Sequence, residues 1–291
     1  MDQKIITINS QSEQTRLIVY ISSQMKLVKF YRLLNTLSID VMLGSVCGAL
    51  MFAKMLQVTL LPYGIAALAL SVWIIYTVDH LLDARNVKGS ASATRHRFHQ
   101  HHFKTLLAIL LVAIAVVIVL LFFIRIQVLH GGLILIGAVA LYLLLHRYLK
   151  IPKEMLISIL YTCGVLLPSY MVTRLSFQEI PYTIVLMFML SAFTNLLVFS
   201  WYDYEKDKRD GFRSVAITLG KSRTQIMVWL VGSIALVLVM LATDRIAAII
   251  IFSVILIQLV LISFPSFFTQ QESYRLLGDA AFMLPLLYLL L

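Results

Sequence analysis

The chain has 291 residues, of which 60% are hydrophobic and only 13% are charged. A soluble domain carries about 25% charged residues, so this composition excludes an ordinary soluble enzyme and predicts a polytopic membrane protein. The net charge of +10 would suggest a nucleic-acid-binding protein among soluble chains, but the topology below accounts for it, and no nucleic-acid partner is expected.

A helix that crosses a membrane needs about 20 mostly apolar residues. Nine stretches meet this requirement and predict one all-α transmembrane domain over residues 33–291, after a polar, basic segment at 1–32. The predicted spans are 36–58, 61–83, 104–124, 127–147, 154–173, 180–202, 223–243, 245–268 and 275–291. The last one is the weakest, because it is short and contains Asp279. Only the connections 84–103 and 203–222 are long.

Lysine and arginine are unevenly distributed among the connections. If the amino-terminal segment lies in the cytoplasm, only Lys54, Arg125, Arg174 and Arg245 fall on the outer side. Basic residues concentrate on the cytoplasmic side of membrane proteins. We therefore expect a multi-pass protein of the cytoplasmic membrane whose N-terminus is inside and whose residue 291 is outside. Both long connections face the cytoplasm, and the four predicted helices between them put them on one side in either orientation.

Each long connection begins near two aspartates that are four residues apart. Asp79 and Asp83 close the second predicted span, and Asp203 and Asp207 follow the sixth. Residues four apart share a helix face, where like charges repel each other, and an apolar setting increases the penalty. A divalent cation would relieve this repulsion, and Mg²⁺ prefers carboxylate, water and phosphate oxygens. The four aspartates are therefore the predicted catalytic and metal-binding residues, whereas Glu205 points away from their face.

Basic residues accompany both pairs of aspartates. The candidate ligands for phosphate are Arg85, Arg95, Lys150, Lys153 and Arg213. Guanidinium and ammonium groups hold phosphate oxygens well. Together with the carboxylates, these basic residues suit a magnesium-bound diphosphate at the cytoplasmic ends of the helices. Each basic residue taken alone could instead be an anchor at the inner membrane surface.

The stretch DYEKDKRDGFRS at 203–214 resembles the second signature of the UbiA family of intramembrane prenyltransferases. That signature places Asp-x-x-x-Asp-x-x-x-Gly before a basic residue and a Ser or Thr. The family's first motif is Asn-Asp-x-x-Asp-x-x-x-Asp, and Asp79 and Asp83 match its last two acidic positions. Ile75 and Tyr76 stand where that motif has Asn-Asp, so this chain departs from the family in half of the first motif.

The resemblance implies helices around a central cavity, with magnesium on the two aspartate motifs holding an isoprenyl diphosphate. Departure of diphosphate would leave a cation-like carbon, which an acceptor, often an aromatic ring, attacks. Aromatic faces tolerate a neighbouring cation, so the candidate substrate-binding residues within the spans are Tyr76, Tyr161, Asn195 and Tyr202. The predicted function is Mg²⁺-dependent prenyl transfer to a small acceptor in the membrane. Aromatic acids such as hydroxybenzoate, porphyrins, sugar phosphates and lipids all remain open as acceptors.

Other hypotheses remain open as well. The incomplete first motif allows a family member that binds prenyl diphosphates or lipids without catalysis. A membrane transporter is the alternative from another class, although transport sites usually lie near the midplane, where only Asp40 and Asp279 are candidates. The histidine-rich run at 95–102 would suit zinc or iron, but contact with lipid headgroups or diphosphate explains it better.

Overall fold

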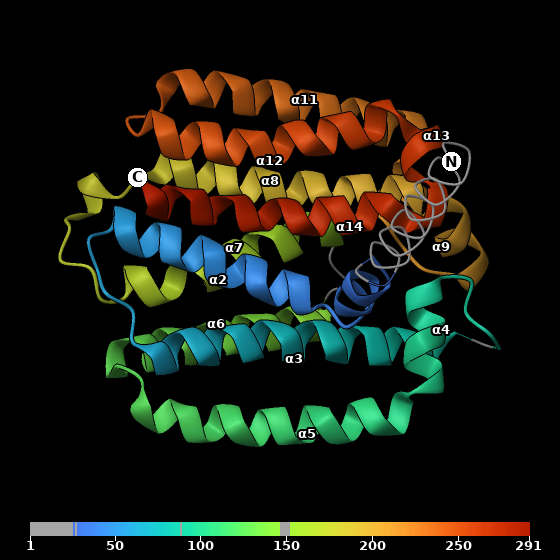
Figure 1. Ribbon diagram of the computed structural model, residues 1–291, viewed down its shortest axis with the longest axis horizontal. Coiled ribbons are helices and arrows are strands. Elements are labelled where there is room, and N and C mark those ends of the chain that lie inside the picture. Colours follow the sequence, from blue (N-terminus) through green and yellow to red (C-terminus); the bar gives the residue numbers. More distant parts are fainter. Residues whose placement is uncertain (1–25, 27, 88, 146–151) are drawn as a thin grey trace, which may run out of the picture.

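The computed structural model describes residue 26 and residues 28–87, 89–145 and 152–291. All regular structure in these ranges is helical, which confirms the all-α prediction, and the long helices run side by side (Figure 1). The long helices are α2 (Ile39–Met55), α3 (Pro62–Asn86), α5 (Phe103–Leu120), α6 (Ile126–Leu145), α7 (Lys153–Tyr170), α8 (Tyr182–Tyr202), α11 (Lys221–Leu241) and α12 (Arg245–Ser263). The short elements are α4 (Thr94–His101), η1 (Leu121–Phe123), η2 (Phe177–Glu179), α9 (Tyr204–Asp210), α10 (Val215–Leu219), α13 (Pro265–Phe268), η3 (Gln270–Glu272), α14 (Ser273–Ala280) and η4 (Ala281–Leu290).

Helices occupy all nine predicted spans within the described residues, but the predicted number of nine spans is not confirmed. Five helices there are long and apolar enough to cross a membrane: α3, α5 with η1, α8, α11 and α12. A sixth span results if Val28–Thr36 and α2, which meet at an angle of 80°, are counted as one broken span. The ninth predicted span is divided between α14, with 8 residues, and the 3-10 helix η4, with 10.

Proline, glycine and aspartate define several helix ends. α3 begins with Pro62, because proline lacks the N–H that would have no partner in the first helical turn. α9 ends at Gly211, whose φ of 76° is a left-handed conformation that glycine adopts without strain. Asp244 caps α12 by accepting a hydrogen bond from the backbone N–H of Ala247 at 3.0 Å. These residues fix where the polar connections leave the apolar helices.

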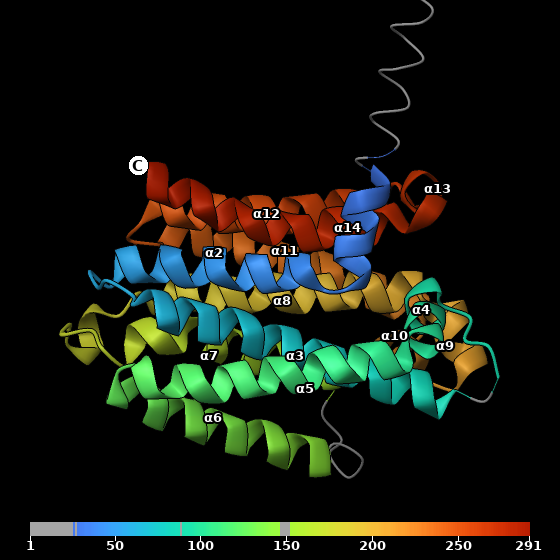
Figure 2. The same ribbon diagram turned by 60° about the horizontal axis from the view of Figure 1, so that its bottom comes forward.

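The two long connections share one end of the protein, as expected, because α4, α9 and α10 lie together there (Figure 2). The backbone N–H of Ser92 donates to both carboxylate oxygens of Asp210, at 3.2 and 3.0 Å, and so joins one connection to the other. The chain reaches residue 291 at the opposite end of the helices (Figure 1).

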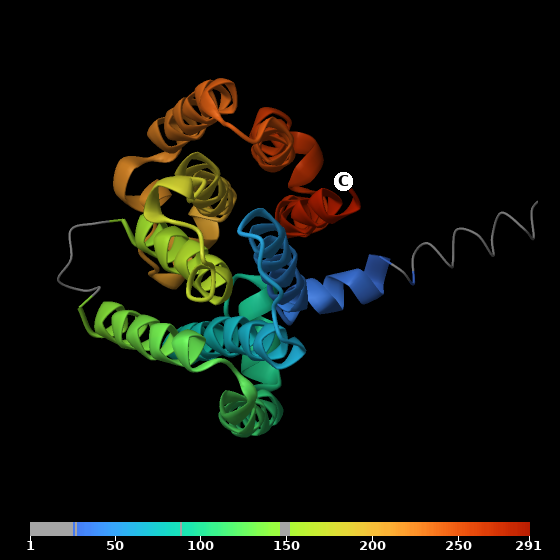
Figure 3. The ribbon, with the colours of Figure 1, turned by 90° about the vertical axis from the view of Figure 1, so that its left-hand side faces the viewer.

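The largest core lies where α2, α7, α8, α12 and η4 converge. Phe52 and Phe188 are buried there with their ring centroids 5.4 Å apart, and Phe282 of η4 lies 6.0 Å from Phe188. An end-on view shows α5 and α6 outside this group (Figure 3). Many apolar side chains of α5 and α6 are exposed, as expected for helices that face lipid.

Gly44 lies at the closest approach of α2 to η4. A Cβ atom added to Gly44 would lie only 2.8 Å from the Cβ of Phe282, a distance that real Cβ atoms essentially never show. Gly44 and Gly48 are one turn apart, which is the spacing that lets membrane helices pack closely. Gly44→Ala should therefore displace η4 and destabilise the protein by about 1–3 kcal/mol.

The measurement is the apparent melting temperature of the purified protein in detergent. Gly137→Ala in α6 is the matched control, because it brings the same gain in helix propensity and an added Cβ there meets nothing within 4 Å. We expect Gly44→Ala to melt several degrees below Gly137→Ala. Equal melting temperatures would show that the contact between α2 and η4 adapts freely.

Candidate functional site

The two pairs of aspartates meet at the end of the helices that carries α4, α9 and α10. Asp79 and Asp83 lie one turn apart on α3. Asp203 follows the last residue of α8, and the backbone N–H of Asp207 donates to its carbonyl at 2.8 Å, so helical geometry continues through the second motif. The charges of Asp79 and Asp207 both act on the carboxylate of Asp83. The fold therefore brings two distant motifs to one site.

Asp203 has internal partners on both of its carboxylate oxygens. The side chain is 6% exposed. Its Oδ1 accepts hydrogen bonds from the Tyr274 hydroxyl at 2.6 Å and from Lys206 Nζ at 3.2 Å, and its Oδ2 accepts one from Arg275 Nη2. Burial opposes ionisation, but the Arg275 and Lys206 cations lower the pKa of Asp203 below its usual value. Asp203 is thus a buried anion whose countercharge belongs to the protein.

The pKa of Asp207 is shifted in the opposite direction from that of Asp203. Burial, and after it the charge of Asp203, raises the pKa of Asp207 to about 6, although the Lys153 cation lowers it in part. Of the two aspartates in the second motif, Asp207 is therefore the one that would gain more from an added cation, and its charge also acts on Asp83 of α3. Glu205, between the two motif aspartates, is exposed.

A magnesium ion fits the Asp83 and Asp207 side of the site better than the Asp203 side. Among the described residues, no three His, Cys, Asp or Glu side chains converge into a group that could hold a metal by themselves. Magnesium does not require such a group, because it commonly takes one or two protein carboxylates and completes its shell with phosphate and water oxygens. Asp83 and Asp207, which come from facing motifs, supply that number, and Asp79 lies one turn from Asp83.

The predicted phosphate ligands fall in different places. The charge of Lys153, at the start of α7, acts on the carboxylates of both motifs, so Lys153 lies at the site. Arg85 and Arg213 are exposed near the same end of the helices. Lys150 lies outside the described residues.

Arg95 points into the protein instead of outward. Its Nη2 donates to the backbone oxygen of Asn35 at 2.8 Å and to its Oδ1 at 3.2 Å, and it lies 3.8 Å from Asp279 Oδ2. Its Nη1 lies 3.2 Å from His80 Nε2. The buried guanidinium thus ties α4 to α3 and α14, and these protein groups use the donors that were predicted to hold phosphate.

A second pair of carboxylates lies behind this guanidinium. Asn35 Nδ2 donates to Asp40 Oδ2 at 2.5 Å and to Asp279 Oδ2 at 2.8 Å, and all three side chains are buried. The sequence names these aspartates only as candidates for a transport site and not as residues of the prenyl-transfer site, although a charged residue within an apolar stretch is a sequence signal for function. Their pairing across α2 and α14 appears only in the structure.

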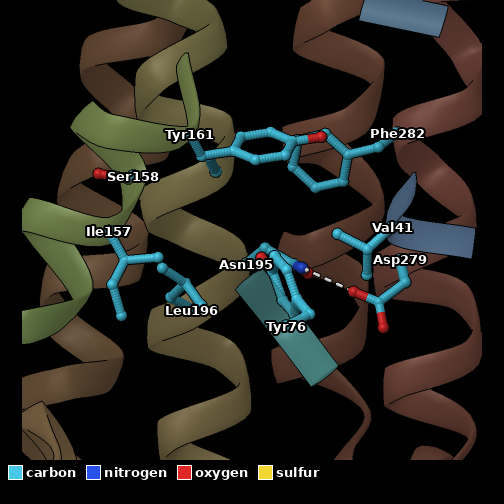
Figure 4. Close-up of a pocket in the computed structure, with 10 residues that line it drawn as sticks. Val41, Tyr76, Ile157, Ser158, Tyr161, Asn195, Leu196, Asp279 and Phe282 are labelled. Atoms are coloured by element: carbon cyan, nitrogen blue, oxygen red, sulfur yellow. Dashed lines mark hydrogen bonds between the residues drawn. The ribbon is translucent and has the colours of Figure 1, made fainter. Parts of the chain in front are cut away.

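A partly open pocket lies among the helices (Figure 4), and the empty space of about 360 Å³ at this place includes its opening. Its wall includes Tyr76 of α3, Tyr161 of α7, Asn195 of α8 and Asp279 of α14. Tyr76 precedes Asp79 by about one helical turn, and Asn195 precedes Asp203 by about two turns. Since a helix rises about 1.5 Å per residue, the pocket lies about 5–12 Å deeper along the helices than the carboxylates. Three of the four substrate-binding residues predicted within the spans therefore line one pocket.

Tyr202, the fourth of these residues, packs elsewhere. Its hydroxyl donates to the backbone oxygen of Leu261 at 2.6 Å, and its ring stacks on Tyr274 with the centroids 4.1 Å apart. Tyr202 therefore joins α8 to α12 and α14 and does not line the pocket.

The histidine-rich run forms α4 and packs against the second motif. The His96 ring lies 5.2 Å from the Phe212 ring, and His99 Nδ1 lies 2.9 Å from the carbonyl oxygen of Arg95. Burial, and after it the charges of Arg275 and Arg95, lowers the pKa of His96 to about 4. His96 is therefore neutral at physiological pH and closes the site by packing.

Sequence reasoning missed the contribution of α14. Arg275 and Asp279 are four residues apart on this helix, and they reach Asp203 and the pocket respectively. It also missed Glu154, a buried residue of α7 whose Oε1 accepts a hydrogen bond from the backbone N–H of Val215 at 2.7 Å. The only signal in the sequence was a charge within or beside an apolar stretch.

Comparison with protein-family models gave one finding. Residues 78–276 match the model of the UbiA prenyltransferase family, which is more than half of the chain. The matched segment runs from the last part of α3 into α14, so it contains both aspartate pairs, α4 and Arg275. Comparison with the curated proteins and with the solved structures gave no match.

Proposed function

Because this chain belongs to the UbiA prenyltransferase family, we propose that it transfers an isoprenyl group from a prenyl diphosphate to a small acceptor in the bilayer, with Mg²⁺ as cofactor. The observation that carries the proposal is the meeting of the Asp83 and Asp207 carboxylates above an apolar pocket. A diphosphate and a prenyl chain need these two environments side by side.

The carboxylates of Asp83 and Asp207, with Asp79 one turn away, would hold the Mg²⁺ together with phosphate oxygens. When bound, the ion neutralises the negative charge that develops on the departing diphosphate. Lys153, whose charge acts on both motifs, would pair with the phosphate oxygens.

We assign Asp203 a positioning role in this reaction. The sequence predicts it as a metal ligand equivalent to Asp207, but its oxygens already accept hydrogen bonds from Arg275, Lys206 and Tyr274. These bonds support a role in holding α14 against the second motif, so that the pocket wall stays aligned with the diphosphate.

The reacting carbon of the prenyl chain would lie at the mouth of the apolar pocket, next to the carboxylates. Tyr76, Tyr161 and Phe282 line this space. Their ring faces can stabilise the positive charge on the carbon that loses diphosphate. The pocket itself would then receive a small acceptor beside that carbon.

We further propose that residues 33–291 form a single prenyltransferase domain of the cytoplasmic membrane and that residues 1–32 lie in the cytoplasm. The distribution of lysine and arginine supports this orientation, with residue 291 outside. The grouping of α4, α9 and α10 at one end is compatible with it (Figure 2).

The first test is the binding of geranylgeranyl diphosphate to the purified full chain, with and without Mg²⁺. Asp79→Ala/Asp207→Ala should lose the Mg²⁺-dependent part, with affinity falling at least about tenfold, because even the second-shell partners of metal ligands are worth that much. Glu205→Ala, an exposed carboxylate of the same segment, should bind like the unaltered chain.

The possible outcomes separate the alternatives. Tight binding without product in an acceptor screen would identify a non-catalytic binding protein. The absence of binding in every condition would overturn the proposal, and flux assays in vesicles would then test transport.

A further inference from the structure

The pocket that would receive the acceptor offers a hydrogen-bond acceptor from α14. Asp279 and Asn195 lie on its wall, and Asn195 Nδ2 donates to Asp279 Oδ1 at 3.3 Å (Figure 4). Asn195 is 6% exposed, and its Oδ1 is buried against Gly278, so the atom that a ligand can reach on this wall is a carboxylate oxygen of Asp279. Each Asp279 oxygen accepts one amide hydrogen bond and keeps room for a second, so this wall favours a ligand that donates hydrogen bonds.

Two buried carboxylates lie beside the pocket. Asp279 and Asp40 are both buried and share one amide donor, Asn35 Nδ2, at 2.8 and 2.5 Å. The cation that contacts this pair is Arg95, whose Nη2 lies 3.8 Å from Asp279 Oδ2. The charge of Arg275 also acts on Asp279, from further away. A further anion close to the two carboxylates would meet repulsion in a low-dielectric setting unless it reached one of these cations.

The nearby cations are engaged with other groups. Arg95 donates to Asn35 and contacts His80, and Arg275 pairs with Asp203 one turn closer to the motifs. The described pocket wall includes neither of them, nor any other lysine or arginine. An acceptor that carries a carboxylate would therefore find a like charge, Asp279, and no countercharge.

We propose that this pocket is the acceptor site and that Asp279 makes it select an uncharged, hydroxyl-bearing acceptor over an anionic one. The inference rests on the proposed prenyl transfer and narrows its acceptor class, because hydroxybenzoate-like acids are disfavoured. The acceptor hydroxyl donates to Asp279, with the aromatic faces of Tyr161 and Phe282 beside it.

This arrangement also accounts for the proton that the reaction releases. The bond between the prenyl carbon and the diphosphate oxygen breaks, and its electron pair leaves with diphosphate. The acceptor forms the new bond to that carbon, and the proton it loses passes to the carboxylate of Asp279.

The test uses two probes that differ by one carboxylate, hydroquinone and 2,5-dihydroxybenzoate. Their binding to the full chain in lipid nanodiscs is measured directly, and their conversion is followed by mass spectrometry with geranylgeranyl diphosphate and Mg²⁺. We expect the unaltered chain to prefer hydroquinone at least about tenfold, because juxtaposed like charges cost several kcal/mol.

Asp279→Asn and Asp40→Asn form a matched pair of variants. Each removes one negative charge from the same buried cluster, but only Asp279 lines the pocket. Asp279→Asn should lose most of the preference for hydroquinone and its conversion, and Asp279→Glu should recover part of both. Asp40→Asn should reduce the preference less than Asp279→Asn does, because Asp40 does not line the pocket.

Several outcomes would overturn the inference. These are a preference of the unaltered chain for 2,5-dihydroxybenzoate, no binding of either probe, or an unchanged preference in Asp279→Asn. If Asp279→Asn does not fold, the preference of the unaltered chain still decides. Geranylgeranyl diphosphate binding in the same nanodiscs separates the two proposals, since its Mg²⁺-dependent binding would persist if only the acceptor assignment is wrong.

Discussion

Replacing Arg275 with methionine is expected to destabilise the protein by about 3–5 kcal/mol, the loss typical of removing one partner of a buried ion pair. Arg275 donates to Asp203 Oδ2, and Asp203 is buried. Without the guanidinium, Asp203 keeps Lys206 and the Tyr274 hydroxyl, which contact its other oxygen. Its Oδ2 would then be buried without a donor, which should loosen α14 from the second motif and weaken prenyl-diphosphate binding.

The measurement is the apparent melting temperature in detergent, together with geranylgeranyl diphosphate binding. Arg209→Met is the control, because this exposed arginine lies in the same motif segment. Adding Asp203→Asn to Arg275→Met should restore part of the stability, since the pair is then removed as a whole. If the single and the double variant melt at the same temperature, Arg275 does not act through Asp203.

Arg95→Met is the second substitution with a large expected effect. Arg95 is the guanidinium that contacts the buried pair of Asp40 and Asp279, and its Nη2 also donates to Asn35. Its removal leaves two buried carboxylates with an amide between them, so we expect a loss of about 3–5 kcal/mol and detachment of α4.

Arg97→Met is the matched control, because Arg97 is exposed two residues further along α4. Melting temperature and limited proteolysis of the segment around α4 are the measurements. Adding Asp279→Asn to Arg95→Met should recover stability, because one of the two buried charges is removed. A double variant that is less stable than Arg95→Met would contradict this electrostatic account.

Much of the fold follows from the sequence because the membrane imposes it. Long apolar runs in a membrane must be helical, because only then do their backbone groups all form hydrogen bonds. Four predicted helices separate the connections 84–103 and 203–222, so both connections must lie at the same end of the helices. The requirement that apolar runs be helical does not by itself give the number of spans, so it does not support the predicted nine. In the last stretch the backbone divides into α14 and η4, a change that apolar composition does not reveal.

Only those features of the candidate site that depend on residues close together in the sequence could be predicted. The spacing of Asp203 and Asp207 is visible in the sequence, but their different electrostatics depend on Arg275, which approaches from a distant helix. Arg95 and Arg97 look equivalent in a polar connection, yet the orientation of α4 buries one and exposes the other. Side chains that tertiary packing brings from distant helices leave no recognisable pattern in the sequence around the motif.

The buried charges of α14 also affect how the protein is made. A charged side chain opposes insertion of a helix into the bilayer by about 2.5–3.5 kcal/mol at its centre and less towards its ends. The countercharges for Arg275 and Asp279 are Asp203 and Arg95, which the ribosome synthesises earlier. We therefore expect α14 to integrate late, against helices that are already in the membrane. A ribosome that stalls before residue 273 would leave a chain whose buried charges lack their partners, so the cell could distinguish unfinished copies from finished ones.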